Sequence, residues 1–318
     1  MSEKFQENIK KYMLTSIMFL TLFLAISIFS TTSIVQAKEN YKNIFFKVEL
    51  KKVVKVNNYY FYYARSKGDS LYNSGFDVYY SDNLSGTYTR KPWGTNIWIN
   101  GENVYYFYGR WLCSYNLSTN KETVLKTCEE LNDTSSYTIK NIYDGKVFFE
   151  KYVCNWPYFK YKVYCYDMKT KKTTKVANDV IIESASGKWI AATLDCPRDI
   201  SAKRIYLYKI KGKKIKKVRC LTKTGFSYGF VNGKLYYSVY NNKSKKYTPT
   251  LYRCNKNGTH RKKLAKIKKK GASQMLIDKI INNTQCRVRI LENKSEQWLY
   301  NFKKHKWIKR VKEATFVD

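Results

Sequence analysis

Acidic residues are the side chains of this sequence that could support the widest range of chemistry. A pair of carboxylates at a suitable separation can cleave a glycosidic bond, one as acid and the other as base or nucleophile. The residues that could approach a shared centre from separate parts of the chain are Asp144, Glu150, Asp167, Glu183 and Asp195. Such residues more often form turns or pair with lysine. We therefore keep a carbohydrate-active enzyme, a glycosidase or lyase, as the alternative function only.

Nucleophile and metal chemistry find less support. The sequence contains two histidines, His260 and His305, and both fall on turns between expected outer strands. Such turns are a poor place to assemble a Ser-His-Asp triad. A C-x-x-C motif is absent, which argues against a zinc site. We expect no metal, no cofactor and no catalytic residue, and therefore a binding protein rather than an enzyme.

Basic and aromatic clusters favour binding. The chain has 60 Lys and Arg against 24 Asp and Glu, a net charge of +36, and a surplus of this size attracts polyanions. The predicted basic contacts are Lys213, Lys214, Lys216, Lys217, Arg261, Lys262 and Lys263. Aromatic residues on loops could stack on a sugar or seat a peptide, and those predicted to do so are Tyr72, Trp156, Tyr158 and Phe159. The alternatives are a solvated lysine face and ordinary loop packing.

A repeat of roughly 45 residues must position these groups. Turn pairs follow a short apolar strand at Asn57-Asn58, Asn100-Gly101, Asp144-Gly145, Ser186-Gly187, Asn232-Gly233 and Asn282-Asn283. Each turn precedes an aromatic or apolar second strand and then a third strand, and a lysine-rich fourth strand closes most units. Six four-stranded units predict an all-β fold, a six-bladed β-propeller. Two β-sandwiches would explain the strands but not the six-fold register.

The first 37 residues differ from the rest. Lys4, Lys10 and Lys11 precede an uncharged run from Tyr12 to Ala37. This pattern predicts a signal peptide over residues 1–37, cleaved after Ala37, with an uncleaved membrane anchor as the alternative. In both cases the propeller, residues 38–318, lies outside the cytoplasm. We expect a monomer that is secreted or attached to the cell surface.

The expected partners follow from that compartment. An extracellular basic protein meets teichoic acids and acidic glycans, and a protein ligand seated by aromatic loops is the other candidate. Nucleic acid is not expected as a partner. The eight cysteines are an even number in an oxidising compartment. The sequence predicts the disulfides Cys113–Cys128 and Cys154–Cys165, each across a hairpin, although buried free thiols would explain the cysteines equally well.

One stretch also carries a family resemblance. Val231 to Ile267 contains V-N-G-K-L-Y-Y-S-V-Y and then T-L-Y-R-C-N-K-N-G-T-H-R-K-K-L-A-K-I. It resembles a blade of the LDL-receptor-type (YWTD) propellers and, more closely, of bacterial propellers related to them and to TolB. The tetrad itself is replaced by Leu235-Tyr236-Tyr237-Ser238. The resemblance implies an exported, mostly non-enzymatic binding or scaffold domain; in the alternative, carboxylates in the funnel of the propeller would make it an enzyme.

Overall fold

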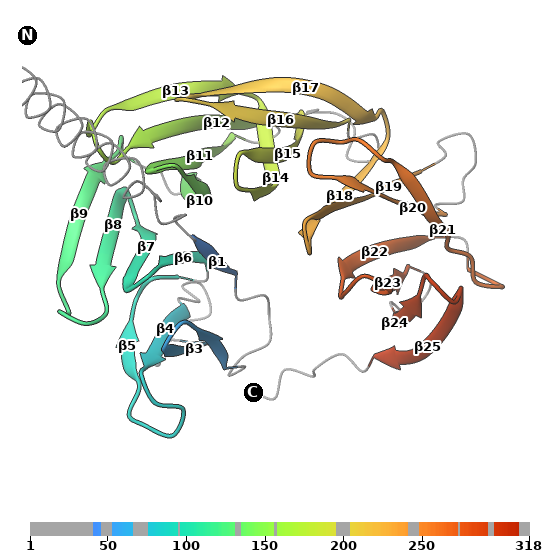
Figure 1. Cartoon of the computed structure of the whole chain (residues 1–318), viewed down its shortest axis with the longest axis horizontal. Helices are drawn as coiled ribbons and strands as arrows, with labels where there is room; N and C mark the ends of the chain where they lie inside the picture. The colour runs from blue at the N-terminus through green and yellow to red at the C-terminus, as the bar shows by residue number, and fades with distance from the viewer. Residues whose placement is uncertain are drawn as a thin grey trace, which may run out of the picture. The chain divides into compact units, whose positions relative to one another are not determined.

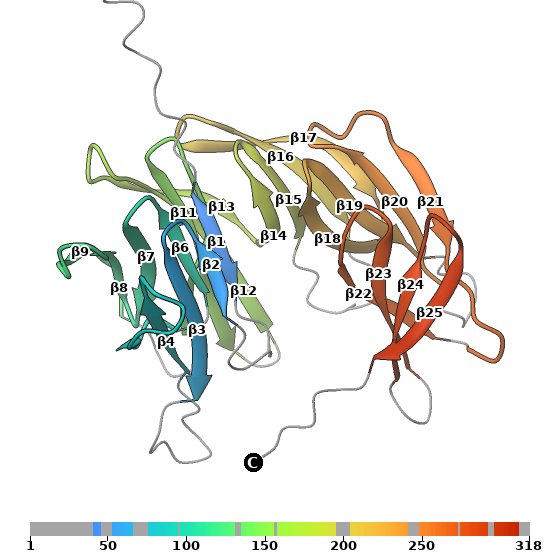
Figure 2. The same ribbon diagram turned by 60° about the horizontal axis from the view of Figure 1, so that its bottom comes forward.

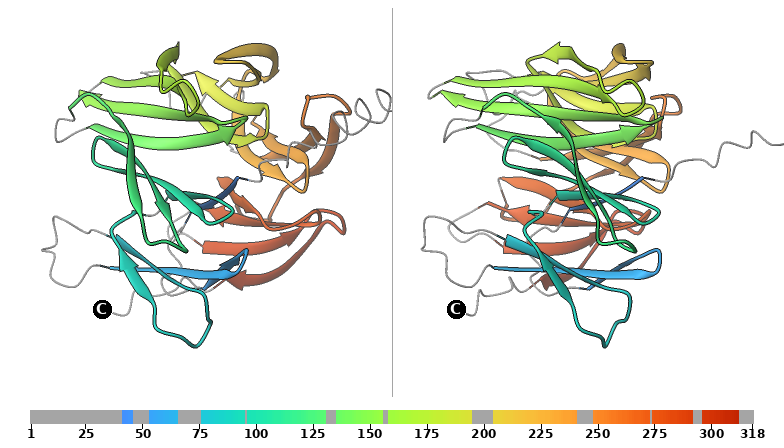
Figure 3. Two further views of the ribbon diagram at one scale, coloured as in Figure 1. Left: turned by 60° about the vertical axis from the view of Figure 1, so that its left-hand side comes forward. Right: turned by 90° about the vertical axis from the view of Figure 1, so that its left-hand side faces the viewer.

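Every helix or strand that the structure describes from residue 41 onwards is a β-strand. The computed structural model describes residues 41–45, 53–65, 76–94, 96–130, 135–155, 158–194, 204–240, 248–272, 274–291 and 296–311. Within these ranges six antiparallel sheets follow one another around a common centre (Figure 1). Successive sheets lie beside each other in chain order, as the two turned views show (Figure 3). The chain is a six-bladed β-propeller, as the repeat predicted.

Each blade is built from four consecutive strands. The first three blades are β2 (Val54–Val56), β3 (Tyr59–Arg65), β4 (Phe76–Ser81) and β5 (Thr89–Lys91); β6 (Asn96–Asn100), β7 (Asn103–Tyr108), β8 (Trp111–Asn116) and β9 (Glu122–Thr127); and β10 (Ser135–Tyr143), β11 (Lys146–Asn155), β12 (Tyr158–Asp167) and β13 (Thr173–Asn178).

The last three blades have the same order. They are β14 (Val180–Ser186), β15 (Trp189–Leu194), β16 (Ile205–Lys211) and β17 (Lys214–Thr222); β18 (Gly225–Val231), β19 (Lys234–Val239), β20 (Thr250–Asn255) and β21 (Lys262–Lys266); and β22 (Met275–Ile280), β23 (Gln285–Ile290), β24 (Glu296–Asn301) and β25 (Lys306–Val311). In the last four blades the first strands, β10, β14, β18 and β22, lie nearest the centre (Figure 1).

Turn chemistry explains why the blades repeat. Asn57, Asp144 and Asn232 have φ of 56°, 53° and 46°, a left-handed conformation that Asn, Asp and Gly adopt most readily. Each of the three begins the turn between the first and second strands of its blade. The predicted turn pairs therefore lie where the sequence placed them, and they fix the register of the strands that follow.

One additional strand was not predicted. β1 (Lys42–Phe45) pairs with β6 in antiparallel register, so the second blade has five strands. Figure 2 shows β1 on the inner side of this sheet, close to β2. The Asn43 side-chain amide donates to Asn96 Oδ1 at 2.6 Å, and Ile44 is buried in the core between the first two blades. A four-residue strand with no turn pair beside it gives little signal in the sequence.

The core consists of apolar clusters between neighbouring blades. Between the first and second blades, Trp93 packs against the rings of Tyr80, Tyr106 and Tyr115 at centroid distances of 5.6, 5.4 and 5.2 Å. The Tyr80 and Tyr115 hydroxyls are 3.0 Å apart, so these rings are packed while their hydroxyls keep a partner. Burying one large side chain of this kind contributes roughly 1.5–3 kcal/mol to the stability of the folded state. The many tyrosines of the sequence therefore help to hold neighbouring blades together.

Candidate functional site

Some residues predicted from the sequence as site residues are not brought into a site by the described structure. Three others, Tyr72, Trp156 and Asp195, lie outside the described residues. Tyr158 and Phe159 belong to β12, which begins at Tyr158, and not to a loop as expected. The loop that joins β11 and β12 is shorter than predicted because both strands extend to ten residues.

Two of the acidic residues serve as turn formers. The Asp144 carboxylate is 2.9 Å from Lys146 Nζ. Asp167 Oδ1 accepts from the backbone amides of Lys169 and Thr170, both at 3.0 Å. The Thr170 amide is the largest cause of the lowered pKa of Asp167. Asp144 and Asp167 therefore act as turn formers or lysine partners, which is the role expected more often for such carboxylates.

The first strands of four consecutive blades share a different feature. Each contains a β-bulge, and the extra residue is polar: Lys140 in β10, Glu183 in β14, Tyr228 in β18 and Asp278 in β22. In every case its side chain bonds a residue ten or eleven positions later, on the second strand of the same blade. A bulge turns one side chain away from the regular pleat and is frequent beside functional sites.

The four bonded pairs differ in chemistry. Lys140 Nζ is 3.0 Å from Glu150 Oε2, and Thr193 Oγ1 donates to Glu183 Oε1 at 3.0 Å. The Tyr228 and Ser238 hydroxyls are 2.6 Å apart. Arg289 Nε is 3.2 Å from Asp278 Oδ2. Three carboxylates, a lysine and an arginine therefore lie on the first and second strands of these blades. No contiguous sequence motif contains them.

Glu150 is the most deeply buried carboxylate of this set, with 3% of its side chain exposed. It accepts hydrogen bonds from the Lys140 ammonium and from the backbone amide of Ile182 in the next blade. Burial raises the pKa of Glu150, although the Lys140 charge and the Ile182 amide oppose the shift. Glu150 thus joins the third blade to the fourth, and the carboxylate of Glu183 lies near enough to add to the shift.

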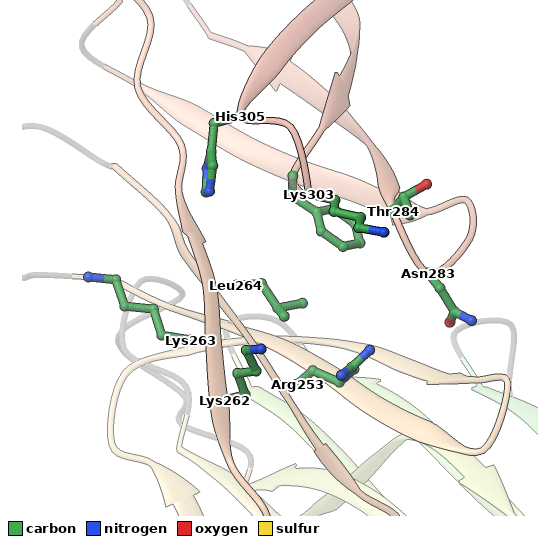
Figure 4. A pocket seen from close by; sticks show the side chains of 9 residues that line it. Arg253, Lys262, Lys263, Leu264, Asn283, Thr284, Lys303 and His305 are labelled. Carbon is green, nitrogen blue, oxygen red and sulfur yellow. The ribbon is translucent and has the colours of Figure 1, made fainter.

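A second candidate site lies between the fifth and sixth blades. Arg253 of β20 and three residues of β21 form one wall, and the turns after β22 and β24 form the other (Figure 4). The cavity has a volume of about 470 Å³. Its lining residues are Arg253, Lys262, Lys263, Leu264, Asn283, Thr284, Phe302, Lys303 and His305. We call this cavity the basic groove.

The charges of the basic groove are all positive. Four of its side chains, Arg253, Lys262, Lys263 and Lys303, are cationic, and none of the described residues that line it is Asp or Glu. Among the residues that the structure describes, none of the four forms an ion pair. Phe302 is 3% exposed and gives the groove an apolar floor, beside Leu264. Clustered cations without a counter-charge provide a binding site for an anion.

The predicted basic residues are only partly brought together. Lys262 and Lys263 line the basic groove, whereas Lys213 pairs with Asp167 at 3.3 Å and Lys217 lies 4.7 Å from the Tyr206 ring. Arg261 packs 4.1 Å over the Tyr252 ring. Lys214 and Lys216 lie on β17, in another blade.

No pattern in the sequence marks Arg253, Lys303 and His305 as site residues, because they come from separate strands and turns. The repeat could have indicated part of this site, because successive blades are neighbours and the turn after β24 lies beside β21 of the preceding blade.

The predicted disulfides are wrong. Cys113 pairs with Val124 across the hairpin and packs in the core between the first and second blades, whereas Cys128 packs on the other side of the same blade. Cys165 is paired with Phe148 and Cys154 with Phe159, so the second pair is also separated by its register. Cys113, Cys128 and Cys165 are free thiols, and the alternative of small buried apolar residues applies to Cys113 and Cys165.

The described ranges of the chain contain no helix long and apolar enough to cross a membrane. They also contain no group of three or more His, Cys, Asp or Glu side chains that could hold a metal ion.

Comparison with known proteins gives a fold and no family. No family model matches the sequence, and no curated protein matches it either. A solved prolyl endopeptidase superposes with a TM-score of 0.53 at 11% identity, over 87% of this chain and 43% of that one. A puromycin-hydrolysing peptidase of Mycobacterium tuberculosis gives 0.51 at 10%, over 82% and 46%. An oligogalacturonate lyase in complex with manganese gives 0.49 at 14%, over 73% and 70%.

These neighbours correct one expectation. The chain spans less than half the length of the two peptidases, and at such identities the likeness shows the fold alone. The two peptidases are nevertheless enzymes, and the expectation that a chain of this fold is not an enzyme is therefore corrected. The physical reason is that a propeller brings side chains together from separate blades. A search for contiguous motifs cannot exclude catalysis in such a fold.

Proposed function

We propose that this propeller recognises an anionic polymer, such as a teichoic acid or an acidic glycan, through the basic groove. The observation that carries the proposal is the absence of any carboxylate among the groove residues, which include four cations. A solvated lysine face would be interspersed with acidic partners, as Lys213 is with Asp167. The other positive charges of the chain, whose net charge is +36, add a long-range attraction for the same ligand.

The groove suits a chain of repeated negative charges better than one small anion. Its cations are distributed over two walls, with Lys303 on one and Lys262 and Lys263 on the other (Figure 4). Polyelectrolyte binding releases condensed counterions, and the affinity therefore falls steeply as salt rises.

The test is a salt series with defined polyanions. We expect polygalacturonate, heparin and a wall teichoic acid to bind the purified protein, with log affinity falling linearly as log salt concentration rises. Titration calorimetry at several salt concentrations measures the slope. A protein ligand seated by apolar contacts would show little salt dependence. A flat slope for all three polymers, or no binding at physiological salt, would contradict the proposal.

A second candidate function is turnover of the bound polymer, which would make the chain a carbohydrate-active enzyme. The observation that favours it is the set of inner-strand carboxylates: Glu183 and Asp278 lie on bulges, and Glu150 pairs with the bulge residue Lys140. Arg289 lies beside Asp278. Burial raises the pKa of Glu150, whereas Glu183 is exposed. A carboxyl with a raised pKa and an exposed carboxyl are the two groups that acid–base chemistry on a glycan uses.

Turnover would appear as new reducing ends, or as the ultraviolet absorbance of an unsaturated uronate if the reaction is an elimination. We expect Glu183→Gln to abolish either signal while polymer binding persists. Asp144→Asn, a change at an exposed turn carboxylate, should leave the rate within about twofold. Activity that survives Glu183→Gln would remove this candidate site.

We also propose that the chain is exported and related to the LDL-receptor-type (YWTD) and TolB-like propellers. Support comes from the uncharged run between Tyr12 and Ala37 and from the fifth blade, whose strands β18 to β21 carry the residues of the resemblance. Mass spectrometry of secreted material should find a mature N-terminus at Lys38. An intact N-terminus in the membrane fraction would support the anchor instead.

A further inference from the structure

Two exposed aromatic rings lie at the tip of one hairpin. Tyr108 and Trp111 flank the Gly109-Arg110 turn between β7 and β8, and they are 50% and 37% exposed. Their ring centroids are 6.0 Å apart and their planes are within 17° of parallel. They are the only aromatic residues among the exposed large hydrophobic residues of the described chain.

Hairpin stability alone does not explain this exposure. Three other blades also pair aromatic rings between their second and third strands: Tyr62 with Tyr79, Tyr152 with Tyr161, and Tyr237 with Tyr252. None of these six residues is exposed to a similar extent. Cross-strand pairs stabilise a hairpin whether or not the rings face solvent, and leaving them in water forgoes the free energy of burial.

Polar groups border the two rings. The Arg110 guanidinium lies 5.6 Å from the Trp111 ring centroid, and its Nη1 donates to Glu130 Oε1 at 2.6 Å. Arg110 and Glu130 are 36% and 85% exposed in their side chains, so both retain capacity to bond hydroxyl groups. A hexopyranose ring offers an apolar face of C–H groups with hydroxyls around its edge. The hairpin tip therefore matches a sugar in both its apolar and its polar parts.

We propose that Tyr108, Arg110 and Trp111 form a sugar-stacking site on the second blade, which takes one or two hexopyranose units of a glycan chain. The inference extends the proposed function by giving the polymer a sugar component, but it rests on a different blade from the basic groove. Trp, Tyr and Arg also anchor protein interfaces. The sugar is favoured because a stable protein contact covers about 800 Å² on each partner, and two rings with one ion pair present far less.

Neutral oligosaccharides in 1 M salt test this site, because salt suppresses charge-driven binding. Cellopentaose, chitopentaose and maltopentaose are titrated against the full-length protein, with tryptophan fluorescence and calorimetry as readouts. We expect at least one of them to bind. Trp111→Ala should weaken that affinity about tenfold, the loss of one stacking contact, and Trp111→Phe should restore most of it.

The controls separate this proposal from the basic groove. Ile308→Ala removes an exposed apolar side chain on β25 and should leave the affinity unchanged. A variant with Arg253, Lys262 and Lys263 changed to glutamate should keep neutral-sugar binding even after losing polyanion binding. If no sugar binds, or if Trp111→Ala binds as well as the parent, the inference is overturned. A change of molecular mass in light scattering on Trp111→Ala would assign the rings to a protein contact and would also overturn it.

Discussion

Lys140→Met should destabilise the propeller by about 3 kcal/mol, because removing one partner of a buried ion pair leaves an uncompensated charge. The charge left behind is the Glu150 carboxylate, whose side chain is 3% exposed. The Ile182 amide would remain its hydrogen-bond donor, which is not enough to replace an ammonium. Urea unfolding of the parent and the variant measures the difference.

Acidification should reduce this loss. Burial already raises the pKa of Glu150 in the folded chain above its value in the unfolded chain, and removing Lys140 raises it further. A carboxyl with a raised folded-state pKa binds a proton more tightly when folded, so lowering the pH from neutral through that interval stabilises the folded state. The deficit of Lys140→Met should therefore shrink between pH 7 and about pH 5.

Two controls accompany this prediction. Lys146→Met leaves the Asp144 carboxylate without its lysine, but this carboxylate is 62% exposed, so the change should cost less than about 1 kcal/mol. The double variant Lys140→Met, Glu150→Gln removes both charges, keeps an acceptor for the Ile182 amide and should recover most of the lost stability. A loss of stability in Lys140→Met that does not depend on pH, or that equals the loss in Lys146→Met, would contradict a stabilising role of the Lys140–Glu150 ion pair.

The triple variant Arg253→Glu, Lys262→Glu, Lys263→Glu should lose most polyanion binding. If the three side chains contact the polymer, the slope of log affinity against log salt should decrease by about three, one for each contact. The matched variant Lys172→Glu, Lys214→Glu, Lys216→Glu changes the net charge by the same amount on exposed strands and turns of other blades.

That matched variant should change the slope by less than about one and should reduce the affinity only through the overall field. Equal losses for the two triple variants would mean that binding depends on net charge and not on the basic groove. Calorimetry with polygalacturonate at several salt concentrations supplies both slopes.

The blades could be predicted from the sequence because their determinants are local. Asn57, Asp144 and Asn232 each fix a turn by their own backbone preference, and lysine-rich fourth strands mark the outer edges. Register within a hairpin is less certain, since one residue of difference changes the partner of every side chain. This is why the sequence paired Cys113 with Cys128, although the fold places them on opposite sides of one blade.

The candidate sites depend on contacts between strands and blades, which the sequence does not display. Lys262 and Lys263 could be selected from a run of basic residues, but Arg253, Lys303 and His305 join them only because the turns of the sixth blade lie beside β21. Glu150 and Glu183 could be nominated as acidic residues. The bulges at Lys140, which pairs with Glu150, and at Glu183 itself are strand irregularities that neither the composition nor the repeat predicts.

Hydrogen–deuterium exchange with and without a short oligogalacturonate locates the polyanion site most directly. The basic groove predicts slower exchange in three segments: the start of β21 around Lys262, the turn at Asn283 and Thr284, and the turn from Lys303 to His305. Exchange in β17 around Lys214 and Lys216 should stay unchanged. Protection confined to β17 or to another blade, or no protection under conditions where binding is saturated, would contradict the account.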